Sequence, residues 1–123
     1  MSTSETIENY LESIHILSLR KGEVRAIDIC RYLEFSRPTV SITLKKLEKE
    51  NYVTVEKNKI KLTEEGLKIA TKMYERHETV AKLLISLGVS EKQAYIDSCL
   101  IEHDLSTESF TALKKIYKKI VKK

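Results

Sequence analysis

The chain has 123 residues, of which 41% are hydrophobic and 33% charged, so it can form one compact domain or two very small ones but not a large enzyme. Its 22 Lys and Arg against 18 Asp and Glu give a net charge of +4, which permits a polyanionic partner without identifying one. Three Gly and one Pro argue against a sandwich or barrel of many short strands. The composition therefore predicts a mainly α-helical protein.

The sequence also argues against a membrane protein and against a fold held together by disulfides. No apolar run approaches the roughly 18 residues that a membrane span needs, and the polar start MSTSETIENY lacks the layout of a signal peptide. We therefore expect a cytoplasmic chain without a membrane partner. Cys30 and Cys99 lie far apart and form no CxxC pair, so neither a disulfide scaffold nor a zinc ribbon is indicated. Cys30 lies on an apolar stripe and is predicted to be a core residue.

The first half of the chain predicts three helices and a hairpin. Ser2 and Glu5 have capping-box spacing, and a first helix then continues to Gly22. A short second helix precedes Ser36, which can cap a third helix with Pro38 in its first turn. The predicted inner faces are Ile7, Tyr10, Leu11, Ile14 and Leu17, then Ala26, Ile29, Cys30 and Leu33, then Val40, Leu44 and Leu47. Alternating residues at 53–56 and 59–62 predict two strands joined at Lys57-Asn58.

The second half predicts three more helices. A long one begins at Thr63 and ends at Gly88, with an inner side of Leu67, Ala70, Tyr74, His77, Ala81 and Leu84. Ser90 and Gln93 form a second capping box that opens a helix through Cys99, Glu102 and His103. Ser106 is predicted to cap the last helix, whose inner side is Phe110, Leu113, Tyr117 and Ile120.

Positive charge concentrates on the third helix and the hairpin, where residues 37–63 hold seven basic and three acidic side chains. Two short helices, a turn, a third helix with polar outward positions and a basic hairpin follow the order of a winged helix-turn-helix. This order predicts binding to double-stranded DNA. The candidate DNA-binding residues are Arg25, Ser36, Arg37, Thr39, Ser41, Ile42, Lys45, Lys46, Lys57, Asn58 and Lys59.

These residue types suit a major groove. Arg and Lys reach guanine or phosphate, hydroxyls reach either, and Ile42 can touch a thymine methyl. The alternative is that the lysines form an ordinary solvated helix face.

A second group of residues has the spacing of metal ligands. Cys99, Glu102 and His103 stand at i, i+3 and i+4, so they are predicted to share one helix face. A thiolate, a carboxylate and an imidazole suit Fe(II), Mn(II), Co(II), Ni(II) or Zn(II) rather than Ca(II) or Mg(II). Further donors would come from His77, Asn9 and Glu12.

Two other interpretations of this group remain open. The three residues can be a core thiol, a surface carboxylate and a polar residue near a helix end. An enzyme with Cys99 as nucleophile and His103 as base also fits the residue types. However, neighbours on one helix do not by themselves provide an orienting group and an oxyanion hole, so we predict no catalysis and keep a small metal- or thiol-dependent enzyme as a distant alternative.

Several motifs resemble a known family over nearly the whole chain. They are ENYLESI at 8–14, SRPTVSITLKKLEKENYV at 36–53, LTEEGLKIA at 62–70, ERHETVAKLL at 75–84 and CLIEHDLS at 99–106. This pattern resembles the diphtheria toxin repressor and manganese transport regulator family of metal-dependent transcriptional repressors. The resemblance implies a winged helix-turn-helix DNA-binding domain at 1–71, followed by a helical metal-binding and dimerisation domain at 72–123, with metal bound between the first helix and the second domain.

Carried over position by position, the resemblance implies a hybrid metal site. Asn9 stands where iron-type members have Met and manganese-type members have Asp, Glu12 resembles the manganese type, and Cys99 resembles the iron type. The ligand set so implied is Asn9, Glu12, His77, Cys99, Glu102 and His103. The thiolate favours Fe(II) over Mn(II), with Zn(II), Co(II) or Ni(II) as possible substitutes. The alternative within this class is a winged-helix regulator that has lost metal control.

The implied function is repression of metal-homeostasis genes by a homodimer on a pseudo-palindromic operator. Apolar residues that a small core does not obviously use support a dimer surface, namely Val80, Leu83, Leu84, Ile85, Leu87 and Val89. The alternative is that all of them pack internally. Six lysines end the chain, at 114, 115, 118, 119, 122 and 123, and we interpret them as a solvated helix end in preference to a DNA contact.

Overall fold

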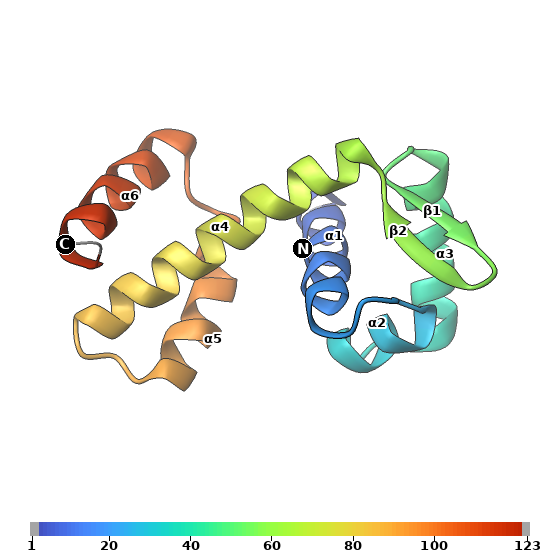
Figure 1. The fold of residues 1–123 in the computed structure, drawn as a ribbon, viewed down its shortest axis with the longest axis horizontal. Helices are drawn as coiled ribbons and strands as arrows, with labels where there is room; N and C mark the ends of the chain where they lie inside the picture. The colour runs from blue at the N-terminus through green and yellow to red at the C-terminus, as the bar shows by residue number, and fades with distance from the viewer. Residues whose placement is uncertain (1–2, 122–123) are drawn as a thin grey trace. The chain divides into compact units, whose positions relative to one another are not determined.

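The computed structural model describes residues 3–121, and the side chains of 5–120. Ser2, Lys122 and Lys123 therefore lie outside the described residues. The elements are α1 (Thr3–Lys21), α2 (Ala26–Leu33), α3 (Arg37–Lys49), β1 (Val53–Glu56), β2 (Lys59–Leu62), α4 (Glu64–Ser86), α5 (Glu91–Ile101) and α6 (Thr107–Val121) (Figure 1). The prediction of a mainly helical protein is confirmed. Across the described range, no helix combines the length and apolar character needed to cross a membrane.

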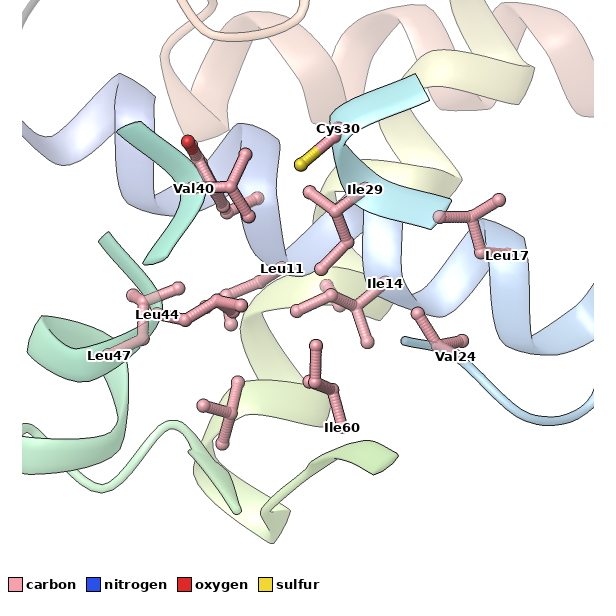
Figure 2. Packing of buried hydrophobic residues seen from close by; sticks show 13 residues of the cluster. Leu11, Ile14, Leu17, Val24, Ile29, Cys30, Val40, Leu44, Leu47 and Ile60 are labelled. Carbon is pink, nitrogen blue, oxygen red and sulfur yellow. The ribbon is translucent and has the colours of Figure 1, made fainter. Parts of the chain in front are cut away.

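The chain divides into two compact units, one ending at Lys72 and the other beginning at Met73, within α4. In the N-terminal unit, α1, α2, α3 and the hairpin surround one apolar core. Figure 2 shows side chains from all of these elements pointing toward one another, among them Leu11, Ile29 and Ile60. Cys30 belongs to this core, as predicted.

Local sequence explains where the first helices begin and end. Gly22, just after α1, has φ +84°, a conformation that glycine adopts without steric cost. The carboxylate of Asp28 accepts the backbone N–H of Arg25 at 2.8 Å and so satisfies a donor at the start of α2. Ser36 Oγ accepts the backbone N–H of Thr39 at 3.3 Å, which confirms the predicted cap of α3.

The two strands form an antiparallel hairpin in which Val53 pairs with Leu62. Lys57 and Asn58 both have positive φ, +51° and +66°, as a two-residue type I′ turn requires. The backbone N–H of Ile60 also donates to the carbonyl of Val24 at 2.8 Å. This bond ties the hairpin to the segment that precedes α2 and completes the winged helix-turn-helix.

The predicted inner side of α4 is partly wrong. Leu67 is 43% exposed, whereas Met73, Val80 and Leu83 are buried. The buried face also carries two polar residues, Arg76 and Thr79, which a search for apolar periodicity passes over. In the second half of α4, the buried residues are therefore shifted by about one position from those predicted to be buried.

The predicted extent of α5 is also wrong. The helix ends at Ile101, Glu102 is its C-cap residue, and His103 lies in the turn that follows. The physical reason is that the N–H of Asp104 bonds to the carbonyl of Ile101, which tightens the chain into a turn. The buried face of this segment consists of Ala94, Ser98 and Glu102.

The apolar residues expected at a dimer surface separate into two groups. Val80 and Leu83 are buried within the fold, so their assignment to a dimer surface is wrong. Ile85 and Leu87 are exposed, and Leu87 is 75% exposed. Ile96 and Leu100 of α5 are exposed as well. The free apolar surface of the C-terminal unit is therefore smaller on α4 and larger on α5 than the sequence predicts.

Candidate metal centre and nucleic-acid interface

Three different donor atoms meet in the C-terminal unit. His77 projects from α4, and its Nδ1 lies 3.0 Å from Glu102 Oε2 at the end of α5. The same Nδ1 lies 3.5 Å from Cys99 Sγ. A carboxylate oxygen and a sulfur thus both lie within hydrogen-bond range of one imidazole nitrogen, and together these three atoms are the donor set of a borderline transition metal.

A second imidazole lies on the other side of the carboxylate. His103 Nε2 is 3.4 Å from Glu102 Oε1, so Glu102 is flanked by His103 and His77. The side chain of Glu102 is 1% exposed. A buried carboxylate costs free energy unless positive groups or a cation compensate it. The structure therefore brings together four of the six predicted ligands, although Glu102 and His103 stand at and beyond the end of their helix.

Buried polar contacts support this cluster. Ser98 is fully buried, and its hydroxyl donates to the backbone carbonyl of His77 at 2.5 Å. This bond joins α5 to α4 beside the predicted ligand His77. Ala94, one turn before Ser98 on α5, is fully buried as well.

Arg76, which precedes the predicted ligand His77, holds the turn that carries two other predicted ligands, Glu102 and His103. Its guanidinium is buried, donates to the carbonyls of Glu102 at 3.1 Å and Leu105 at 2.7 Å, and lies over the ring of Phe110 at 5.2 Å. Sequence reasoning missed both Arg76 and Ser98. For Arg76 the sequence did contain a signal, because an arginine stands inside a predicted helix and directly before the candidate ligand His77.

The surroundings of His77 alter its protonation. Burial alone lowers the pKa of His77, but the hydrogen bonds and charges of Cys99 and Glu102 outweigh burial and raise the pKa to about 10. Without metal, the imidazole therefore carries a proton at neutral pH.

We expect metal binding near pH 7.5 to release about one proton from His77, because only a neutral imidazole can coordinate a metal. Metal affinity then rises with pH up to the pKa of about 10. Anaerobic calorimetry with Mn(II) in two buffers of different ionisation enthalpy measures the number of protons released. A binding heat that is the same in both buffers contradicts the prediction. His77→Gln should lower the number of released protons by about one, whereas any proton that the Cys99 thiol loses on metal binding is released by both proteins.

The remaining predicted ligands, Asn9 and Glu12, occupy neighbouring turns of α1 in the N-terminal unit. Their side chains offer an amide oxygen and a carboxylate, both of which are metal donors.

The candidate DNA-binding residues of α3 lie on its exposed face. Arg37, Thr39, Ser41, Ile42, Lys45 and Lys46 are all exposed, and so is Ser36 at the cap. A cleft of about 410 Å³ is lined by residues of α2, α3 and the hairpin. Its polar lining residues are Arg25, Arg37, Ser41 and Asn58. The exposed polar side chains of α2, α3 and the hairpin thus border one concave surface.

Two of the candidate DNA contacts share an acidic neighbour that the sequence did not predict. Glu23 lies 2.9 Å from Lys59 Nζ and 3.4 Å from the guanidinium of Arg25. Chiefly through its hydrogen bond and charge, Lys59 holds the pKa of Glu23 below its usual value. Glu23 thus orients Arg25, just before α2, and Lys59, which directly follows the hairpin turn, while Lys57 and Asn58 are exposed in that turn.

Family comparisons assign both halves of the chain. The iron-dependent repressor N-terminal DNA-binding domain matches residues 2–60, and the iron-dependent repressor metal-binding and dimerisation domain matches residues 63–123. A curated relative, the HTH-type transcriptional regulator MntR of Geobacillus kaustophilus, is 38% identical over 102 residues, which is 82% of this chain and 72% of the relative. The chain belongs to the iron-dependent repressor family.

Other members of the repressor family extend this result. MntR of Bacillus subtilis is 36% identical over 108 residues, or 87% of this chain and 76% of that protein. Among solved structures, the manganese regulator SloR is 28% identical with a TM-score of 0.75, over 89% of this chain and 52% of SloR. The structure of T. acidophilum IdeR matches in fold, with 23% identity and a TM-score of 0.75 over 95% of this chain and 54% of IdeR.

The chain thus spans about half of the length of these two solved structures. The family consists of transcriptional regulators, which confirms the prediction that this repressor homologue is not an enzyme. It also confirms that the chain contains a DNA-binding domain and a domain for metal binding and dimerisation.

Proposed function

We propose that the chain is a transcriptional repressor of metal-homeostasis genes whose operator binding requires a transition metal at His77, Cys99, Glu102 and His103. The observation that carries the proposal is the convergence of nitrogen, sulfur and oxygen donors around the buried carboxylate of Glu102. Cys99 is exposed, so a metal can reach it from solvent.

The metal is proposed to be Fe(II) or Mn(II), with Fe(II) preferred. A thiolate donor softens the site and favours Fe(II), Co(II), Ni(II) or Zn(II) over the harder Mn(II). Two observations point toward Mn(II): the relatives include a named manganese regulator, and Glu12 adds a carboxylate oxygen to the proposed donors. Replacing Cys99 by glutamate should therefore move the preference toward Mn(II).

We further propose that Asn9 and Glu12 complete the ligand shell from α1. A metal bound by both parts of the chain would limit how the DNA-binding domain at 1–71 is oriented on the metal-binding and dimerisation domain at 72–123. If one orientation fits the operator, metal and operator binding strengthen each other by the same factor.

In the DNA complex, α3 would enter the major groove and the hairpin tip would contact the neighbouring backbone. A homodimer would place two α3 helices roughly 34 Å apart, one DNA turn, and so read a pseudo-palindromic operator. The exposed apolar residues Leu87, Ile96 and Leu100 are proposed to contribute to the dimer contact. A repressor of this kind acts on chromosomal DNA, so we place it in the cytoplasm.

A second candidate is a DNA-binding regulator without metal control. Asn9 favours it, because a neutral amide provides a weaker ligand than a carboxylate. The deciding experiment selects operators from random DNA under anaerobic conditions with Fe(II), Mn(II), Zn(II) or a chelator. Binding that is equally strong with the chelator supports the second candidate and overturns the first.

Removing two lysines from α3 tests the DNA contact itself. We expect Lys45→Ala/Lys46→Ala to reduce the slope of log K against log salt by about 2, since each phosphate contact contributes roughly 0.9 to that slope. Fluorescence anisotropy with a selected operator measures the slope. The matched control is Lys82→Ala/Lys92→Ala, which removes the same charge from exposed positions in the C-terminal unit. Equal slopes for the two double variants would exclude α3 as the reading helix.

A further inference from the structure

One apolar side chain stands among the polar residues of the reading helix. Ile42 is 71% exposed, whereas the other aliphatic residues of α3, Val40, Leu44 and Leu47, are buried. Exposing this side chain gives up the free energy that burial of a β-branched aliphatic group provides. We propose that Ile42 contacts the 5-methyl group of a thymine and makes that base a determinant of operator specificity. This inference rests on the proposed function.

The position of Ile42 follows from helix geometry. At 100° per residue, Ile42 lies about 200° around the axis from Val40, and Leu44 and Leu47 lie within about 40° of Val40. Ile42 is therefore almost opposite the buried stripe, at the centre of the outward face. In the N-terminal unit α3 also packs beside β1 of the hairpin (Figure 1).

Basic and hydroxyl side chains surround this position on the helix. Lys45 and Lys46 lie at i+3 and i+4, and Thr39 lies at i−3. All three are exposed. The cations complement phosphate groups on either side of a groove, while the centre of the face offers only methyl and methylene groups. An isolated apolar group inside a cationic face does not fit an apolar protein partner, which would need a continuous apolar patch.

Only one chemical group in the major groove is a suitable partner for an exposed aliphatic side chain. Base edges there present hydrogen-bond donors and acceptors, and the 5-methyl of thymine is their only apolar group. Ile42 can neither donate nor accept, so a polar base edge facing it loses water without gaining a hydrogen bond. Contact with a thymine methyl instead removes apolar surface of both Ile42 and the methyl group from water.

A double-mutant cycle between protein and DNA tests the contact. Each thymine of a selected operator is replaced singly by uracil, which removes only the methyl group. For one thymine per half-site, we expect affinity of the parent protein to fall about fourfold, the value of one buried methylene-sized group. With Ile42→Ala, the same replacement should change affinity less than about 1.5-fold, because most of the contact is already lost.

The matched control is Lys45→Ala, which should weaken binding and lower the salt slope while retaining the fourfold difference between thymine and uracil. Circular dichroism melting checks that the exposed substitution at position 42 leaves the fold intact. An equal uracil effect in the parent and Ile42→Ala, or no sensitive thymine in an operator that is bound with normal salt dependence, overturns the contact alone. Absence of salt-dependent DNA binding overturns the proposed function together with this inference.

Discussion

Glu102→Gln should abolish the response of DNA binding to metal. Glutamine has nearly the same shape but no charge, so the site loses its central anionic donor while its packing is kept. We expect metal affinity to fall by more than the roughly 10–100-fold that loss of an outer-shell partner costs. The effect is large because Glu102 faces both His77 and His103, and its side chain is almost fully buried.

Anaerobic metal titration and operator binding with and without metal measure this effect. The matched control is Glu108→Gln, which makes the same change at an exposed position in the first turn of α6. Thermal melting without metal shows whether the variant remains folded. If Glu102→Gln still responds to metal as the parent does, the carboxylate is not a ligand and the proposed centre is wrong.

Gly66→Ala should strongly destabilise the N-terminal unit. A Cβ at Gly66 would collide with the backbone carbonyl oxygen of Tyr52 and would lie 3.3 Å from the side chain of Leu62. The Tyr52 carbonyl also accepts the backbone N–H of Thr63 at 3.0 Å, so it is held in place. Relief therefore requires backbone movement between α4 and the hairpin, and we expect a cost of about 3 kcal/mol, the upper end for overpacking.

Chemical denaturation followed by circular dichroism measures this loss of stability. Glu65→Ala provides the control, because it makes a substitution to alanine at an exposed site in the same turn of α4. A change in unfolding free energy within about 0.5 kcal/mol, as is usual for surface substitutions, would contradict the steric argument.

Local signals predicted the N-terminal unit well. The cap at Ser36 and the turn at Lys57-Asn58 depend on side chains and dihedral preferences within a few residues, and both are present. The buried residues of α3 were also predicted, because their spacing is strictly helical. The convergence of Cys99, Glu102 and His77 followed from spacing and from the family resemblance together.

Features that depend on buried polar groups were not predictable in the same way. The long-range bonds from Arg76 to the backbone of Glu102 and Leu105 leave no periodic signal in the sequence. Because Arg76 and Thr79 occupy part of the inner face of α4, the apolar pattern placed that face about one position away from the buried one in the second half of the helix. The family resemblance predicted which residues are ligands but not the residues that fix their positions.

Ala94 and Ser98, two small buried residues of α5, also lie close to the predicted ligands without being donors themselves. Both are buried on the face of α5 that also carries Glu102, and the hydroxyl of Ser98 bonds to the backbone of His77, so a larger side chain at either position should change how far the donor atoms of His77 stand from those of Cys99 and Glu102. If these donors hold the proposed metal, selectivity for an ion of a given radius depends both on the donors and on small side chains that are not themselves proposed ligands. Two repressors with identical ligands can therefore differ in metal preference through residues at positions 94 and 98.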